Sequence, residues 1–387
     1  MAQLSDFDDI RPYAAGEVRP ALNALLNDRQ FKLVLKSFAP FLPPFLLSGL
    51  IKIGFIGINT PLDFQFRFMK PTVKLVLKKC SDGCTFVNDP SVTWDKRHSF
   101  ISNHRDIVLD SAILSLKLVQ AGSPTTCEIG IGDNLLIYPW IRTLVKINKA
   151  FTVRRSLTPK ELMQSSIHLS EYMHFVINEK KDNLWLAQRE GRAKDSSDHT
   201  QESVIKMLAY GFDGSHVDAL RDLNIVPLTI SYEYDPCDYL KAKEFQQKRD
   251  NPAFKKTRQD DRENMKTGIL GYKGRIHYET APSINTWLDD LTEMSPHEFY
   301  TEVARRIDNE IYKRYKLFPC NYIALDRLNG NYAYASHYTA EDMKKFDAYL
   351  QGQLAKIDIP NKDEEFLMER MLTMYANPAR NHLDAIK

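Results

Sequence analysis

The 387-residue sequence predicts an α/β fold: a mixed sheet covered by helices, with an N-terminal amphipathic helical segment and a helical C-terminal region. Two patterns lead to this prediction. From residue 98 to about residue 280, short β-branched or aromatic runs alternate with helical patterns, as in sheets with helices on their faces. After residue 296 the apolar residues recur every four positions, which makes one narrow helical face. We therefore divide the chain into 1–90, 91–296 and 297–387.

The composition is that of an ordinary globular protein, with 43% hydrophobic and 26% charged residues. A net charge of +2 argues against a dedicated nucleic-acid binder, which usually carries a concentrated basic excess. The 5 cysteines are scattered and odd in number, so they fit no disulfide framework and favour a reducing compartment. The first 20 residues contain acidic groups and no apolar core, so we expect no cleaved secretory signal.

The segment from Phe41 to Ile58, "FLPPFLLSGLIKIGFIGI", is strongly apolar but is interrupted by Pro43, Pro44 and Lys52. Aromatic and aliphatic residues precede it, and a lysine-rich stretch follows it. This arrangement is typical of a segment that lies in the headgroup region of a membrane without crossing it. A buried helical hairpin explains the same pattern, and the sequence does not decide between the two.

Six strands are predicted from runs of β-branched and aromatic residues bounded by polar clusters. They are residues 98–102, 127–131, 150–155, 184–188, 225–233 and 274–279.

Helices are predicted between these strands. The clearest one begins "SLTPKELMQ", where Thr158 is the N-cap, Pro159 the first helical residue and Glu161 the third, and it runs to about residue 177. Another follows Asp106 and ends near Gly122, because glycine commonly ends a helix.

Two later segments depart from the alternating pattern. Residues 248–268 are highly charged, and we expect an excursion or a mobile loop there, before the last strand. The chain beyond residue 296 is predicted to be largely helical. The apolar face of its first helix consists of Phe299, Val303, Ile307 and Ile311.

The stretch "FISNHRDIVLD" places His104 where a strand ends and a helix begins. That edge of an α/β sheet is where such folds place their active sites. A carboxylate six residues later, Asp110, can hold one ring nitrogen and leave the other as a base. Asp106 directly precedes the helix, so we expect it to cap the helix instead. A purely structural histidine is the alternative.

Basic residues follow two other predicted strands. Arg154 and Arg155 end the third strand, where guanidinium groups can bind a phosphate through paired hydrogen bonds. Glu190, Gly191 and Arg192 follow the fourth, and Gly191 would let backbone approach a ligand. The alternatives are a solvated helix face for the first group and an ordinary polar turn for the second.

In this order, each at the end of a strand, the motifs resemble those of the glycerolipid acyltransferase superfamily, the glycerol-3-phosphate and 1-acylglycerol-3-phosphate acyltransferases. The matching segments are "SNHRDIVLD", "FTVRR", "QREGRAKD" and "NIVPLTISYE". Two details depart from the family pattern. The interval from His104 to Asp110 is one residue longer, and no threonine or glycine separates Gly191 from the arginine. Either departure can mark a subgroup with a different acceptor.

The resemblance implies an enzyme that moves a fatty acyl group from acyl-CoA or acyl carrier protein to a hydroxyl of glycerol-3-phosphate or a lysophospholipid. His104 would be the general base and Asp110 the residue that orients it. No metal or other cofactor is expected. The acceptor would be bound by five residues: Arg154, Arg155, Glu190, Gly191 and Arg192.

The expected partners are therefore the acyl donor and membrane lipids, with no nucleic acid, and the expected location is the cytoplasmic face of a membrane. Two other functions remain open. One is an acyltransferase with a non-phosphate acceptor, as in aminolipid synthesis. The other is a membrane-binding scaffold without catalysis.

Overall fold

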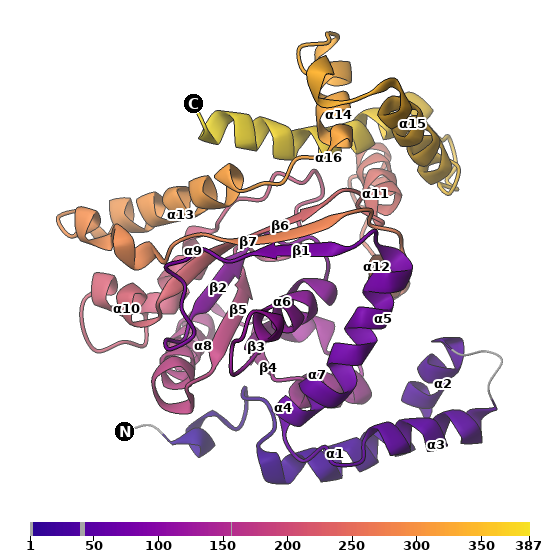
Figure 1. Ribbon diagram of the computed structural model, residues 1–387. Helices are drawn as coiled ribbons and strands as arrows, with labels where there is room; N and C mark the ends of the chain where they lie inside the picture. The colour runs from indigo at the N-terminus through magenta and orange to yellow at the C-terminus, as the bar shows by residue number, and fades with distance from the viewer. Residues whose placement is uncertain (1–2, 39–42, 156) are drawn as a thin grey trace.

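The computed structural model describes residues 3–38, 43–155 and 157–387, and it contains the predicted mixed sheet covered by helices (Figure 1). The sheet has seven strands in the order β1-β7-β6-β2-β5-β3-β4. The strands are β1 (Cys84–Val87), β2 (Ser99–Ser102), β3 (Cys127–Gly132), β4 (Ala150–Val153), β5 (Asn183–Ala187), β6 (Ile225–Tyr232) and β7 (Ile276–Thr280).

All neighbouring strands are parallel except β6 and β7. Strands β2 to β6 therefore end at one edge of the sheet, which we call the C-terminal edge. Ser102, the last residue of β2, pairs with Ala187 of β5 and Leu228 of β6. The polar residues that follow these strands are brought together by this register.

The six predicted strands are confirmed, although β4 ends at Val153 and not at residue 155. Strand β1 was not predicted. It lies inside the N-terminal segment 1–90 and pairs with β7, so the sheet begins earlier in the chain than the sequence indicated.

Helices cover both faces of the sheet because alternate strand residues point in opposite directions. Ile101 packs in one core and Phe100 in the other. The first core includes residues of α8 (Pro159–Phe175), α9 (Glu202–Ala209), α10 (His216–Asp222) and α13 (Pro296–Lys313). The second includes residues of α5 (Lys70–Cys80) and α6 (Leu109–Gln120).

Helices α8 and α6 lie where the sequence predicts them, but α6 begins a few residues later than expected. Helix α8 begins with the predicted capping box, in which the Glu161 carboxylate accepts from the Thr158 N–H at 2.9 Å. Helix α6 starts at Leu109, three residues after Asp106. It ends next to Gly122, whose φ of +93° favours glycine.

The prediction of a mobile loop within residues 248–268 is wrong. The segment contains the end of α11 (Asp238–Asp250) and most of α12 (Arg258–Leu270). A capping box between Thr257 and Asp260 starts α12. The charged residues of this segment are largely those of a solvated helical surface.

The C-terminal region is helical, as predicted, and it divides between two cores. The predicted apolar face of α13 is buried against the sheet. Three further helices, α14 (Pro319–Asn329), α15 (Ala340–Leu354) and α16 (Glu364–Ala385), form a core of their own that also includes Ala242 of α11. Figure 1 shows these helices stacked at one end of the molecule, beyond β6 and α11.

The N-terminal segment packs around a separate apolar core with α7 (Pro139–Ile147). The helices of the segment before α5 are α1 (Ala15–Asn27), α2 (Arg29–Phe38), α3 (Pro44–Gly54) and α4 (Pro61–Phe64). Phe41, where the apolar stretch begins, lies outside the described residues. Along the described parts of the chain, no helix combines the length and the apolar character needed to cross a bilayer.

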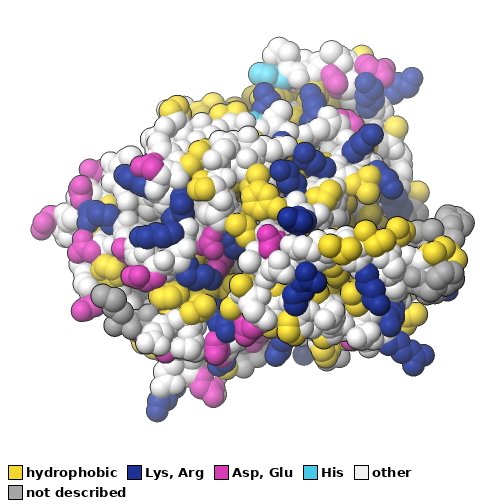
Figure 2. All heavy atoms as spheres, turned by 60° about the horizontal axis from the view of Figure 1, so that its bottom comes forward, with side chains coloured by type: hydrophobic (Ala, Val, Ile, Leu, Met, Phe, Trp, Pro, Cys, Tyr) yellow, Lys and Arg dark blue, Asp and Glu magenta, His cyan; other side chains and the backbone are white. Residues whose placement is uncertain are grey.

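Helix α3 is apolar on two sides. Ile51 packs toward the N-terminal core, as does Phe55 just after the helix. The opposite side exposes Leu46, Leu50 and Ile53, which are spaced so that they share one helical face. In Figure 2 a row of hydrophobic side chains leads to the grey atoms, with Lys and Arg side chains beside it. One side of α3 is therefore packed in the N-terminal core, as the hairpin alternative predicts, and the other side is exposed.

Gly211, in the turn that follows α9, permits a close contact with α8. A Cβ atom there would lie 2.5 Å from the Ile167 carbonyl oxygen and 2.6 Å from the Glu171 nitrogen, both in the backbone of α8. We expect Gly211→Ala to lower the free energy of unfolding by about 1–3 kcal/mol, because α8 must shift to make room.

Gly352→Ala in α15 is the matched control for urea unfolding, since a Cβ there meets nothing within 4 Å. It should raise the free energy of unfolding by up to about 1 kcal/mol, the difference in helix propensity. Equal effects of the two substitutions would contradict the packing argument.

Candidate active site

His104 and Asp110 form a hydrogen-bonded pair at the C-terminal edge of the sheet. The His104 Nδ1 atom lies 2.9 Å from Asp110 Oδ2. The same oxygen accepts from the backbone N–H groups of Arg105, at 2.7 Å, and Asp106, at 3.0 Å. Because this oxygen already accepts two hydrogen bonds, we assign Nδ1 as the donor of the third. In the neutral ring, Nε2 then carries a free lone pair.

The environment of the pair is closed on one side and open on the other. The Asp110 side chain is completely buried, whereas that of His104 is 13% exposed. The Nε2 atom of His104 makes no hydrogen bond within the described part of the chain. The arrangement therefore holds one ring nitrogen firmly and leaves the other available to a ligand.

Two buried tyrosines complete the surroundings of Asp110. The Tyr232 hydroxyl donates to Asp110 Oδ1 at 3.2 Å, and the Tyr278 hydroxyl donates to the Asp110 carbonyl at 3.2 Å. Burial, with the neighbouring Asp110 charge, raises the pKa of both tyrosines well above the usual value. Both hydroxyls therefore remain protonated donors across the neutral range.

The chain before His104 is fixed by side chains of neighbouring strands. Asn103 pairs with the backbone of Ile230 in β6, donating to its carbonyl at 2.9 Å and accepting from its N–H at 2.8 Å. Trp185 of β5 donates to Ser102 Oγ at 3.1 Å, and its ring meets the His104 ring edge to face at 5.8 Å. The histidine is thus held by two strands as well as by its own turn.

Asp106 caps the turn that leads into α6. Its Oδ1 accepts from the N–H groups of Val108, at 2.9 Å, and Leu109, at 2.8 Å. Asp110, and not Asp106, therefore contacts the histidine ring, as expected from the sequence. Burial, reinforced by the Asp110 charge, raises the pKa of Asp106.

A buried ionic cluster lies behind His104, and the sequence analysis did not identify it. Asp235 Oδ2 lies 2.7 Å from Lys241 Nζ and 3.6 Å from Arg105 Nη2. Burial alone would raise the pKa of Asp235, but Lys241 and Arg105 hold it well below its usual range. The buried Asp198 carboxyl has the opposite shift, because burial raises its pKa more than Arg105 and Lys241 lower it.

One signal in the sequence points to this cluster. Asp235 follows β6 by three residues, just as His104 follows β2 by two, so both fall at the C-terminal edge. Arg105 directly follows His104, which the sequence already indicates as a candidate site residue. Their pairing itself depends on strands far apart in the sequence.

The three arginines predicted to bind phosphate have different partners. Arg154 pairs with Asp9 at 2.8 Å, and Arg155 pairs with Glu190 at 3.0 Å. The Arg192 Nη2 atom is 3.4 Å from Asn264 Oδ1 in α12. Its Nη1 is buried and finds no hydrogen-bond partner among the described residues. The structure joins Arg155 to Glu190 and places Arg154 and Arg192 in separate contacts.

Gly191 lies between Glu190 and Arg192 in an exposed turn. Its φ of +67° belongs to the left-handed region, and a Cβ there would meet nothing within 4 Å. The glycine is therefore explained by its backbone conformation. It leaves open space beside the Arg155–Glu190 pair.

Comparisons with known proteins identify no family for the chain. No family model and no curated protein sequence matches it. Among solved structures, the chain is similar to the crystal structure of PlsC, the 1-acyl-sn-glycerophosphate (LPA) acyltransferase from Thermotoga maritima. The identity is 11%, the match covers 77% of this chain and 99% of that chain, and the TM-score is 0.37. A similarity of this size assigns no function to the chain.

The environment of Asp106 predicts a dependence of stability on pH. Since its pKa in the folded protein is raised above the ordinary 3.8, folding favours the protonated carboxyl. This contribution is present at low pH and is lost as the pH rises through the folded-state pKa. We expect Asp106→Asn to reduce the fall in the free energy of unfolding as the pH rises above the ordinary aspartate pKa of 3.8.

Asp106→Ala is the comparison, because alanine removes the cap as well as the charge. It should lower the free energy of unfolding by about 0.5–2 kcal/mol. Urea unfolding of both variants and the wild type across the pH range measures the two effects. An unchanged pH dependence in Asp106→Asn would contradict the raised pKa.

Proposed function

We propose that the protein is an acyltransferase that moves a fatty acyl group from acyl-CoA or acyl carrier protein to a hydroxyl of glycerol-3-phosphate or a lysophospholipid. The observation that supports this most is the His104–Asp110 pair, with Nδ1 held by a buried carboxylate and Nε2 left free at the C-terminal edge. The order of the strand-end motifs, which resembles the glycerolipid acyltransferase superfamily, adds to it.

The chemistry follows from the assignment of the ring protons. Nε2 of His104 takes the proton of the acceptor hydroxyl while that oxygen attacks the thioester carbonyl. The carbon–sulfur bond then breaks, and the departing thiolate takes the proton back from the imidazolium. Asp110 stabilises the imidazolium in between, because its carboxylate is held facing Nδ1. The acyl group passes directly from sulfur to oxygen, with no acyl-enzyme.

Arg155 is the residue that we propose for the acceptor phosphate. Its guanidinium already pairs with an anion, the exposed Glu190 carboxylate, at 3.0 Å. A phosphate can replace that carboxylate with a bidentate contact. The buried guanidinium of Arg192 would add positive charge beneath the phosphate. Its Nη1 atom has no hydrogen-bond partner among the described residues, which supports this role. Arg154 is the weakest of the three, because it pairs with Asp9.

We also propose that the apolar face of α3 rests on the cytoplasmic surface of a membrane. Leu50 and Ile53 are 56% and 65% exposed, and Ile56, just after the helix, is 67% exposed. Helix α5 adds the exposed Leu75 beside exposed lysines. Exposed apolar side chains flanked by lysines suit an interface of anionic headgroups and acyl chains. Such a position would bring a lipid acceptor to the enzyme.

The catalytic proposal predicts a strong effect at Asp110. Asp110→Asn should lower turnover by about 100-fold or more, because the ring loses the charge that fixes it as a base. The measurement is release of free thiol from acyl-CoA or acyl carrier protein in the presence of glycerol-3-phosphate or a lysophospholipid. His104→Ala should be at least as severe.

The control is Asp106→Asn, which keeps the cap and should remain active. If Asp106→Asn abolishes turnover and Asp110→Asn does not, the assignment of the base is wrong. If the wild type releases thiol only with acceptors that lack a phosphate, Arg155 has another role. If it releases none with any acceptor, the scaffold alternative gains support.

The membrane proposal predicts that Ile53→Glu/Ile56→Glu abolishes co-flotation with vesicles of anionic phospholipid, because two charges would enter the apolar layer. Tyr332→Glu is the control, since Tyr332 is exposed in the loop that follows α14. High salt should weaken flotation of the wild type only in part. Complete release by salt would mean that the lysines alone bind the surface.

A further inference from the structure

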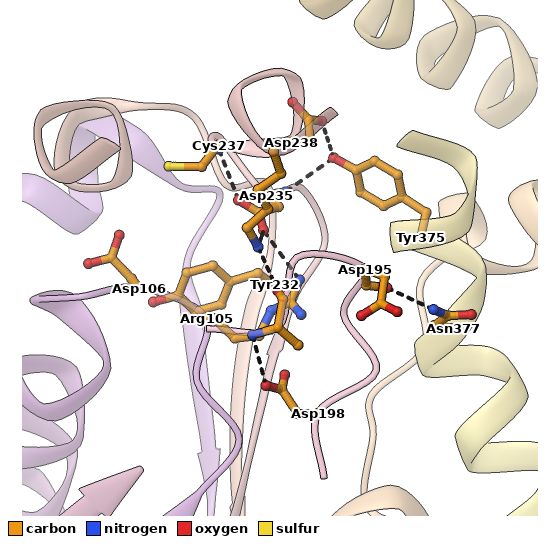
Figure 3. Close-up of polar contacts among 12 residues, drawn as sticks. Arg105, Asp106, Asp195, Asp198, Tyr232, Asp235, Cys237, Asp238, Tyr375 and Asn377 are labelled. Carbon is orange, nitrogen blue, oxygen red and sulfur yellow. Dashed lines mark hydrogen bonds and ion pairs between the residues drawn. The ribbon is translucent and has the colours of Figure 1, made fainter. Parts of the chain in front are cut away.

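Helix α16, at the far end of the sequence, reaches the region of His104 through two polar side chains. Figure 3 shows Tyr375 and Asn377 pointing from α16 toward the turn after β6 and toward Asp195. The Tyr375 hydroxyl donates to Asp238 Oδ2 at 2.6 Å and accepts from the Asp235 N–H at 3.2 Å. Both contacts are buried, so each replaces water that the groups would otherwise bind.

Through Asp235, Tyr375 is connected to the turn that carries His104 and Asp110. Asp235, whose backbone Tyr375 holds, directs its carboxylate at Lys241 and Arg105. Arg105 follows His104 directly, and its N–H donates to the same Asp110 oxygen as the histidine ring. A shift of Asp235 therefore moves a side chain whose backbone belongs to the His104–Asp110 turn.

The second contact holds the segment on the other side of His104. Asn377 Nδ2 donates to the Asp195 carbonyl at 2.8 Å. This segment follows β5 and carries Glu190 and Gly191. Lys241 reaches it as well, donating to the Ala193 carbonyl at 3.2 Å. The segment is thus fixed both from α16 and from the Asp235 cluster.

Helix α15 also forms hydrogen bonds with the Asp235–Asp238 turn. The Tyr349 hydroxyl donates to the Asp235 carbonyl at 3.2 Å, and Gln353 donates to Asp238 Oδ1. Burial, with the Asp235 charge, raises the pKa of Asp238 to about 7, while the hydrogen bonds of Tyr375 and Gln353 act in the opposite direction. Asp235 and Asp238 therefore each form hydrogen bonds with both α15 and α16.

We propose that α16 positions the active site, with Tyr375 holding the Asp235 turn and Asn377 holding the segment after β5, so that Arg105 and the His104–Asp110 pair keep their geometry. The proposal rests on the proposed function for its effect on turnover. Tyr375 touches no reacting atom and is a positioning residue. The C-terminal helices would then be a working part of the enzyme as well as a separate core.

The test compares two tyrosine-to-phenylalanine variants. Tyr375→Phe removes the hydroxyl that contacts Asp235 and Asp238. Tyr338→Phe removes a hydroxyl that donates to Asp326 at 2.8 Å within the C-terminal helices, away from the Asp235 turn. Both lose a tyrosine–aspartate hydrogen bond, but only Tyr375→Phe also loses the bond from the Asp235 N–H. Tyr338→Phe therefore controls for the loss of one such bond elsewhere in the C-terminal helices. Asn377→Ala tests the second contact and covers the case in which Tyr375→Phe does not fold.

Two readouts decide. One is the pair of imidazole nitrogen resonances of His104, assigned with His104→Gln, which report its tautomer and hydrogen bonding. The other is kcat at saturating substrates. We expect Tyr375→Phe and Asn377→Ala to shift the resonances and to lower kcat by about 10-fold to 100-fold, the scale of a small misplacement of a catalytic group. Tyr338→Phe should change neither.

Unchanged His104 resonances in both Tyr375→Phe and Asn377→Ala overturn the proposal, as does a kcat loss that Tyr338→Phe shares. If the wild type transfers no acyl group, the proposed function fails separately. The resonances alone then decide whether α16 holds the histidine.

Discussion

One carboxylate oxygen, Asp110 Oδ2, organises the turn between β2 and α6. It accepts three hydrogen bonds, from the His104 ring and from two successive backbone N–H groups. These N–H groups lie ahead of the helix and have no helical partner, so without Asp110 they would be buried and unpaired. The same oxygen therefore fixes the backbone of the turn and the orientation of the ring. The residue that orients the histidine ring also keeps the chain folded around it.

The local features of this site could be read from the sequence, whereas its long-range pairings could not. The strands, the Thr158 capping box and the His104–Asp110 spacing each depend on residues a few positions apart. Strand β1 is only four residues long, and its partner lies in β7, so no local pattern marks it. Charge misled the prediction for α12, because a solvated helix and a loop have similar compositions.

The arginines show the same limit. The sequence places Arg154, Arg155 and Arg192 at one edge of the sheet, but each finds a partner in another part of the chain. The cluster of Arg105, Asp235 and Lys241 is formed by the loop after β2, the turn after β6 and helix α11. Removing one member of such a buried group typically costs about 3–5 kcal/mol, because the remaining charge is left without a partner. The site is therefore sensitive to changes well outside its own turn.

Strand β1 also bears on the order in which the molecule can be assembled. It lies at the edge of the sheet, and its one neighbour, β7, is the last strand in the chain. During synthesis the N-terminal helices emerge first, yet the strand that follows them has no partner until the ribosome has passed residue 280. The N-terminal core is also incomplete until α7 has been made, because Ile147 is part of it. Apolar surface and an unpaired strand edge that stay exposed during that interval are features that chaperones bind.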